Sequence, residues 1–181
     1  AGADPNVANN LDISPLLQAS RYGNAEMIAA LLASGATLSS TAPGLVESPF
    51  MAAARSGSVA AIDVLLEAGA NPNETDPVQN QTALMWATAE GHLTMVEHLL
   101  NEGADPNMQA RVSDLTKRSV NADYPSGGFA ALPWAARNGD EAIIKLLLEQ
   151  DADINITNGD QSTPMMLAIV NDRFDIANML L

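Results

Sequence analysis

The chain has 181 residues and a net charge of −14, because 22 acidic residues outweigh only 8 Lys and Arg. Such a charge argues against binding to nucleic acids or anionic membranes, both of which attract cationic surfaces. No cysteine is present, so disulfide frameworks and thiolate sites are excluded. No apolar run approaches the roughly 18 residues of a membrane span. We therefore expect a soluble chain, and its compartment, cytoplasmic or exported, stays open.

Leucine pairs recur along the chain, and their first members are 34, 34, 48 and 33 residues apart. The pairs are Leu31-Leu32, Leu65-Leu66, Leu99-Leu100, Leu147-Leu148 and Leu180-Leu181. Seventeen residues before them lie Ser14-Pro15-Leu16, Ser48-Pro49-Phe50, Thr82-Ala83-Leu84, Ala130-Ala131-Leu132 and Thr163-Pro164-Met165. Landmarks that recur in a fixed order identify an internal repeat. We expect five units, at about residues 2–34, 35–68, 69–102, 103–150 and 151–181.

The first unit shows the local structure that the others repeat. Ser14 followed by Pro15 predicts a helix N-cap with proline at the first helical position, where its missing N–H costs nothing. Gly23 ends this short helix, and Asn24 can cap a second one. Apolar residues of the second helix sit at i, i+1, i+4 and i+5, which predicts one broad buried stripe. A Gly-Ala-Asp/Asn-Pro-Asn segment after most leucine pairs indicates a turn that leads into a hairpin-like loop.

The fourth and fifth units depart from this pattern. The Thr-Pro cap is lost in the fourth unit, and Pro133 predicts that its first helix begins one to three residues late. The same unit holds about 14 extra residues, all within the segment 108–129. Loops of this length are usually either functional or disordered, and we expect Tyr124 and Phe129 to anchor the segment against the stack. The fifth unit stops at Leu180-Leu181.

The chain resembles the ankyrin repeat family, whose signature T-P-L-H-x-A, leucine pair and G-A-D-x-N recurs here five times in register. The resemblance implies an all-α solenoid of five helix–turn–helix units with projecting β-hairpin-like loops, and a protein-binding groove lined by the first helices. Apolar residues replace the signature histidine, so its polar link between repeats is expected to be absent. They are Leu17, Met51, Met85, Pro133 and Met166. In the fourth unit, Gly-Gly-Phe and Leu-x-Trp-Ala-Ala-Arg-Asn-Gly also resemble bacterial, often exported, ankyrin proteins.

Cations and tryptophans occupy matching positions in several units. Arg21, Arg55 and Arg137 lie two residues before the glycine that ends the first helix, a position that faces the groove in the ankyrin family. One hypothesis is that these arginines bind the carboxylates of an acidic partner. The alternative is that they complement the helix dipole and pair with neighbouring Asp or Glu. Trp86 and Trp134 also share a position, either as a contact platform or as packing between helices.

We expect a protein–protein interaction scaffold that binds its partner through the groove, the loop tips and the segment 108–129. The candidate contact residues are Arg21, Tyr22, Arg55, Trp86, Glu90, Arg111, Lys117, Arg118, Tyr124, Trp134, Arg137 and Asn138. The alternative is an assembly element whose end faces stack on further repeats or on other copies. Residues 2–6 read as the tail of a preceding repeat, and with the abrupt stop at Leu181 they favour a segment of a longer array.

No catalytic, metal or cofactor site is expected. His92 and His98 are six residues apart, which places them on different faces. Asp151-x-Asp153-x-Asn155 resembles the start of a calcium-binding loop but lacks its glycine and its final glutamate. Phosphate loops, nucleophile elbows and dinucleotide fingerprints are absent from the sequence.

Overall fold

The described part of the chain folds into five pairs of short helices. The computed structural model describes residues 2–38, 47–112 and 127–181, and these hold ten helices. The first helices of the pairs are α1 (Pro15–Arg21), α3 (Pro49–Ser56), α5 (Ala83–Ala89), α7 (Ala131–Asn138) and α9 (Pro164–Val170). The second helices are α2 (Ala25–Ala33), α4 (Val59–Glu67), α6 (Leu93–Asn101), α8 (Glu141–Glu149) and α10 (Phe174–Met179).

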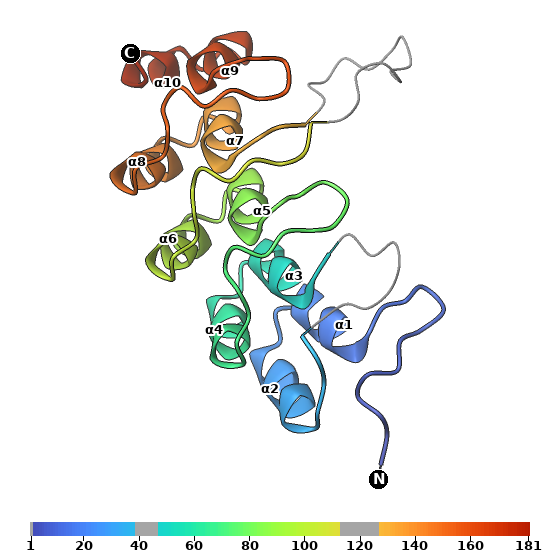
Figure 1. Cartoon of the computed structure of the whole chain (residues 1–181). Coiled ribbons are helices and arrows are strands. Elements are labelled where there is room, and N and C mark those ends of the chain that lie inside the picture. The colour runs from blue at the N-terminus through green and yellow to red at the C-terminus, as the bar shows by residue number, and fades with distance from the viewer. Residues whose placement is uncertain (1, 39–46, 113–126) are drawn as a thin grey trace.

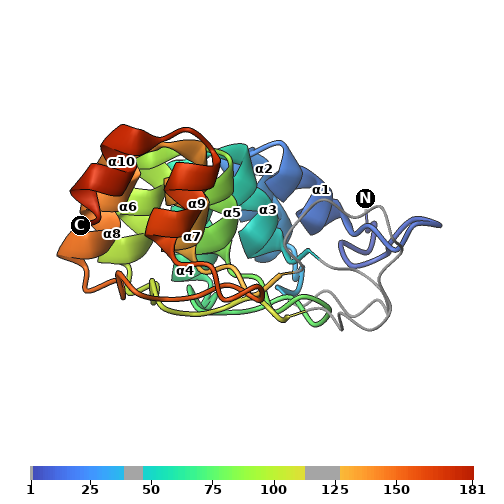
Figure 2. The same cartoon turned by 90° about the horizontal axis from the view of Figure 1, so that it is seen from above.

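The pairs stack side by side into a bent solenoid. Figure 1 shows the first helices in one row, on the inner side of the bend, and the second helices in an outer row. The connecting loops run in one layer across the same end of the helices (Figure 2). The predicted all-α solenoid with projecting loops is confirmed. Among the described residues the loops contain a single isolated antiparallel bridge, between Val112 and Gly127.

Four of the first helices start at the predicted Ser or Thr cap. In α3, the Ser48 hydroxyl oxygen accepts a hydrogen bond from the backbone N–H of Met51, at 3.1 Å. Ser14, Thr82 and Thr163 accept in the same way from the third helical residue, at 3.1, 3.3 and 3.3 Å. Each cap satisfies one of the N–H groups that a helix leaves without an internal partner.

The expectation of a late start for the fourth of these helices is wrong. Helix α7 begins at Ala131, in register with its counterparts, and Pro133 is its third residue. Elsewhere the third residue donates its N–H to the cap hydroxyl, but Ala130 has no hydroxyl and Pro133 has no N–H. Donor and acceptor are lost together, so no unsatisfied group remains and the helix needs no shift.

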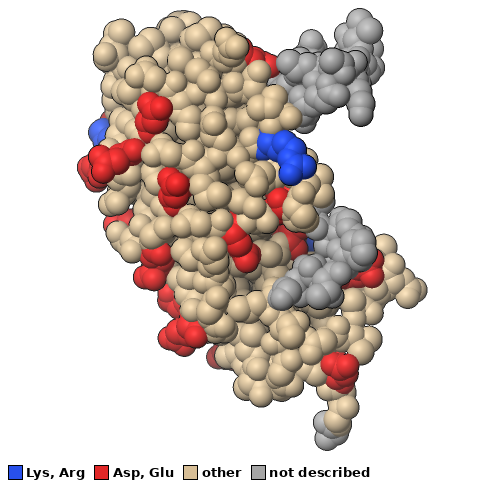
Figure 3. Space-filling view, in the orientation of Figure 1, with Lys and Arg blue, Asp and Glu red and all other residues tan. Residues whose placement is uncertain are grey.

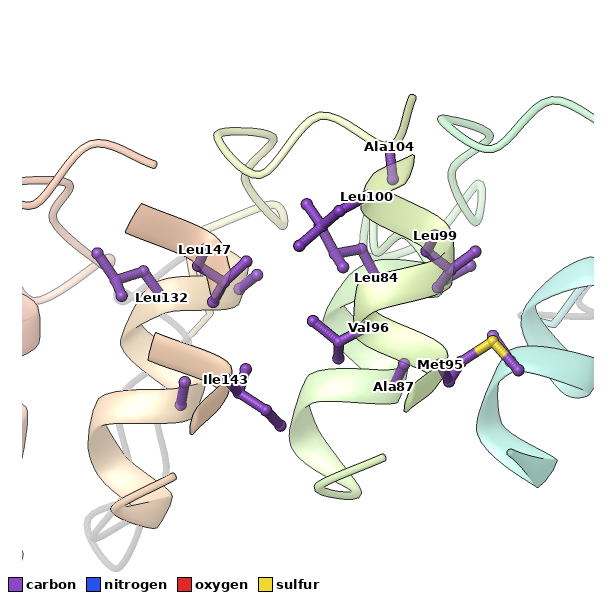
Figure 4. Packing of buried hydrophobic residues seen from close by; sticks show 14 of the residues in the cluster. Leu84, Ala87, Met95, Val96, Leu99, Leu100, Ala104, Leu132, Ile143 and Leu147 are labelled. Atoms are coloured by element: carbon purple, nitrogen blue, oxygen red, sulfur yellow. The ribbon is translucent and has the colours of Figure 1, made fainter. Parts of the chain in front are cut away.

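The leucine stripes form the core between neighbouring pairs. Leu65, Leu99 and Leu147 are completely buried. Figure 4 shows Val96 and Leu100 pointing toward the next pair of helices, from which Ile143 and Leu147 point back into the same layer. The residues that replace the signature histidine in the first three units, Leu17, Met51 and Met85, are 1–2% exposed. They fill the seam between first helices with apolar volume, as predicted.

Asparagine side chains connect the turns of successive units. The Asn73 amide donates to the Gly103 carbonyl at 2.9 Å, and its Oδ1 accepts from the Asp105 N–H at 2.7 Å. Asn6 makes the same pair of bonds to Gly35 and Thr37, and Asn107 makes it to Asp151 and Asp153. These bonds hold the turns at a fixed spacing, so the loops that follow them start from fixed positions.

Polar links also join successive units near the turn between the first and second helix of each unit. The Ser58 hydroxyl donates to the Gly23 carbonyl at 2.8 Å. The His92 Nε2 lies 2.9 Å from the Arg55 carbonyl oxygen, and the Asn138 amide donates to the Ala89 carbonyl at 3.1 Å. The hydrogen bond of the signature histidine is expected to be absent. Successive units are instead linked by hydrogen bonds to backbone carbonyls at or just after the end of a first helix.

Leu99→Ala tests this packing against a matched control in the same register. Leu99 is 0% exposed, so its truncation leaves a cavity and should lower the unfolding free energy by about 2–5 kcal/mol. Leu31 occupies the equivalent position in the first unit but is partly exposed, and Leu31→Ala should cost roughly half as much. Urea unfolding followed by circular dichroism measures both, and equal losses would contradict a core built between units.

Candidate partner-binding surface

Two arginines on the inner side of the stack share one carboxylate. The Arg21 Nε lies 2.8 Å from one oxygen of Glu47, and an Arg55 terminal nitrogen lies 2.9 Å from the other. The Glu47 side chain is only 12% exposed, against 30% and 39% for Arg21 and Arg55. Glu47 is therefore a partner for the alternative hypothesis, in which the arginines pair with neighbouring acidic residues. Two cations, however, share this one anion. This three-residue cluster keeps a net charge of +1 on a strongly acidic chain.

The two tryptophans lie on adjacent first helices and enclose a hollow. Trp86 on α5 and Trp134 on α7 are both half-buried, and together with Gln81, Met85 and Ala89 they line a hollow of about 150 Å³. Their rings are therefore partly packing and partly surface, which combines the two hypotheses drawn from the sequence.

Each tryptophan ring is held by a neighbouring side chain. The Arg55 guanidinium lies over the Trp86 ring, 5.4 Å from its centroid. The Arg137 guanidinium lies 5.3 Å from the centroid of Trp134, and the Phe129 ring packs against Trp134 with 4.7 Å between centroids. Cation–π contacts of this kind contribute about 0.5–1 kcal/mol each at exposed sites. They favour one orientation of each ring.

The other candidate contacts lie at different places. Tyr22 is 78% exposed, but it lines a separate hollow of about 350 Å³ formed by α1 and α2 alone, at the end of the stack. Glu90 is exposed at the C-cap of α5. Asn138 uses its amide in the repeat junction described above. Lys117, Arg118 and Tyr124 lie outside the described residues.

The base of the 108–129 segment is hydrogen-bonded to the loops on both sides. The Arg111 N–H donates to the Gln79 carbonyl at 2.5 Å, and the Arg111 carbonyl accepts from the Gly128 N–H at 3.2 Å. The Gly127 carbonyl accepts from Gly159 at 3.0 Å. Three successive loops are thus joined by backbone bonds. A Cβ on Gly128, whose φ is +74°, would lie 2.6 Å from the Gly159 nitrogen, so this crossing requires glycine.

Phe129 anchors the segment as predicted, because it is 4% exposed and packs against Trp134.

A family model described as ankyrin repeats (3 copies) matches residues 16–110 and again residues 112–181. The chain belongs to the ankyrin repeat family. Ankyrin repeats are generally protein–protein interaction modules, and the family is typically a non-catalytic scaffold.

Glu47 is the residue of this ankyrin surface that the sequence analysis missed. It directly precedes the Ser48 cap, where the other units carry Ile13, Gln81, Phe129 and Ser162, none of which is charged. A lone acidic residue at that position, with arginines at the groove position of its own unit and the preceding one, is the signal by which the sequence could have predicted the ion pairs.

Both histidines of the ankyrin stack make contacts between repeats. His92 contacts the Arg55 carbonyl, and the His98 Nε2 lies 2.7 Å from the Asp63 carboxylate on α4. Within the described ranges no group of three or more His, Asp or Glu side chains is placed to hold a metal ion. In the same ranges no helix is long and apolar enough to cross a membrane.

One carboxyl group at a repeat junction has a shifted pKa. Glu74 accepts a hydrogen bond from the Ser48 hydroxyl of the preceding repeat. Burial raises the pKa of Glu74 above its ordinary value of 4.5, and the hydrogen bond from Ser48 opposes part of that rise. A raised pKa in the folded state means that the protonated form is favoured by folding. The contribution of Glu74 to stability is therefore complete at low pH and is lost as the pH rises through its folded pKa.

Glu74→Gln should stabilise the protein at neutral pH, because the amide is uncharged and still accepts from Ser48. The melting temperature of the variant should exceed that of the wild type at pH 7, and the difference should shrink as the pH falls through the folded pKa of Glu74, which lies above 4.5. Melting curves between pH 4 and 8 measure this, with Glu67→Gln on the exposed face of α4 as the control. A difference that grows toward acid pH would contradict the assignment.

Proposed function

We propose that this ankyrin repeat chain binds a protein partner through its inner surface, which comprises the first helices, the adjoining loop tips and the segment 108–129. The observation that carries the proposal is the row of Arg21, Arg55, Trp86, Trp134 and Arg137 on successive first helices. Arginine and tryptophan are the residue types most enriched among binding hot spots.

The distribution of charge favours an acidic partner. Of the six cations among the described residues, Arg21, Arg55 and Arg137 lie on the inner first helices and Arg111 lies in the loop layer, while Lys145 and Arg173 belong to the outer row. Exposed carboxylates follow the outer helices, on the left in Figure 3. They include Glu26, Asp63, Glu67, Glu97, Glu141 and Glu149. Complementary fields steer a partner toward the inner side and away from the outer one.

Replacing Arg21 and Arg55 together by glutamine tests this proposal. Binding proteins are first selected from a proteome-wide display library, and their affinity is then measured by calorimetry. The double variant should lose tenfold or more in affinity, because charge-assisted hydrogen bonds contribute about 1.5–3 kcal/mol each. Glu67→Gln combined with Glu97→Gln, on the outer face, should bind like the wild type. A third variant with a Gly-Ser linker in place of residues 113–126 measures what the insertion adds.

The same variants separate binding from packing. If the Arg21/Arg55 variant keeps its affinity for every selected partner but melts at a lower temperature, the arginines serve only the ion pairs with Glu47. That outcome would contradict the proposed role of the arginines.

A second candidate function, end-to-end assembly, is supported by the exposed end faces. In the fifth unit Met166 and Ile169 are 51% and 46% exposed, although their equivalents Met85 and Thr88 are 2% and 0% exposed. In the first unit Met27 is 50% exposed, although its equivalent Met95 is 1% exposed. Each end thus presents apolar positions that a neighbouring unit covers elsewhere in the stack, and such a face suits a further repeat or a second copy.

Assembly of this kind predicts a sedimentation coefficient that rises with protein concentration, because head-to-tail contacts do not close. Ile169→Glu should abolish the rise by placing a charge on the end face, whereas Glu149→Gln on the outer face should leave it unchanged. A wild-type chain that sediments as a monomer over the whole concentration range would rule out assembly through copies of this chain.

A further inference from the structure

The hollow between Trp86 and Trp134 lies where the third unit lacks the arginine that three other units carry. Arg21, Arg55 and Arg137 occupy the seventh position after the cap in the first, second and fourth units. In the third unit that position holds Ala89, which lines the hollow. A methyl group stands where its neighbours carry a long side chain, and the space between the two indole rings stays open.

The size of this hollow suits one aromatic ring of a ligand. Its volume is about 150 Å³, and an apolar cavity of about that volume is large enough to bind benzene. Among the residues that the structure describes, its lining comprises Met85, Trp86, Ala89 and Trp134 together with the polar Gln81. A phenylalanine or leucine side chain can therefore enter it and remove its apolar surface from water.

The walls are held in place before anything binds. Glu47 holds Arg55 at 2.9 Å, and Arg55 lies over Trp86. On the other side Phe129 packs against Trp134. Because the rings are already oriented, binding a side chain between them orders few additional groups, and that lowers the entropic cost of association.

We propose that this hollow receives a single phenylalanine-sized side chain of the partner, carried on an acidic segment. This inference rests on the proposed function, since the hollow lies on the inner surface. The acidic flanks follow from the charges at its rim. Within the described part of the chain, Arg55 and Arg21 share the Glu47 carboxylate, so two cations at this rim face one anion. The apolar residue gives the anchor, and the neighbouring carboxylates of the partner face Arg55 and Arg21.

The probe is the peptide acetyl-Glu-Glu-Phe-Glu-Glu-amide, titrated into the full chain at low ionic strength. Trp86 and Trp134 are the two tryptophans of the chain, so indole fluorescence and the two indole N–H resonances report on the hollow directly. Both resonances should shift and saturate. The same peptide with alanine in place of phenylalanine should bind at least tenfold more weakly, and so should a peptide with lysine flanks.

Two variants of the chain at one position separate insertion from charge. Ala89→Arg restores the residue that three other units carry in this position, so the fold accepts it, and it fills the hollow while adding a positive charge. Insertion predicts at least a tenfold loss of affinity for the phenylalanine peptide, whereas attraction by charge alone predicts a gain. Ala89→Leu should lose affinity in the same way, and Ala60→Leu on the exposed face of α4 should bind like the wild type.

The inference is overturned if the phenylalanine and alanine peptides bind equally or not at all, or if Ala89→Arg binds as tightly as the wild type. Equal binding of the glutamate-flanked and lysine-flanked peptides would overturn the acidic part of it. Where a selected protein partner is lost with the Arg21/Arg55 variant but retained by Ala89→Arg, the proposed function holds and the hollow is not its anchor.

Discussion

Burial of the leucine stripes between neighbouring units is the interaction on which the rest of this structure depends. Its helices have only six to nine residues, and isolated helices shorter than about 12 residues are marginal in water. Each helix is therefore stable because the next pair covers its apolar face. Each pair thus stabilises its neighbours in the stack. The repeat that places Leu65, Leu99 and Leu147 at equivalent buried positions also places surface residues at equivalent positions in successive units. A functional surface on such a stack is a set of equivalent positions, and no single pair of helices carries it alone.

Features that depend on local chemistry could be predicted from the sequence. The leucine interval, the Ser14 and Thr82 caps and the apolar replacement of the signature histidine all follow from residue type and spacing, and the structure shows each of them. The expectation for Pro133 was wrong because proline was judged alone. Its missing N–H matters only where the cap offers an acceptor, and Ala130 offers none. A prediction for one residue of a helix terminus fails when its partner residue has changed as well.

The site could be predicted only in part, because its side chains meet across units. The arginine and tryptophan positions were visible as periodic residues, but Glu47 also pairs with Arg21 of the preceding unit, which lies 26 positions away in the sequence. The hollow beside Ala89 was equally hidden, since it is defined by what that residue lacks relative to its equivalents. In a repeat protein the regular positions predict the fold, and the irregular ones determine what the surface recognises.

Two irregularities adjoin each other on the inner surface. The fourth repeat carries the insertion, whose base is bonded to the loops on either side through Arg111 and Gly127. Phe129 ends that base and packs against Trp134, which is one wall of the hollow. The backbone at the base of the insertion is therefore connected, through Phe129, to the Trp134 ring that lines the hollow. Under the proposed function, contacts made by the insertion and contacts made in the hollow should therefore be coupled through Phe129 and Trp134. Such coupling would be measured as non-additive losses in a cycle that combines Ala89→Arg with replacement of residues 113–126.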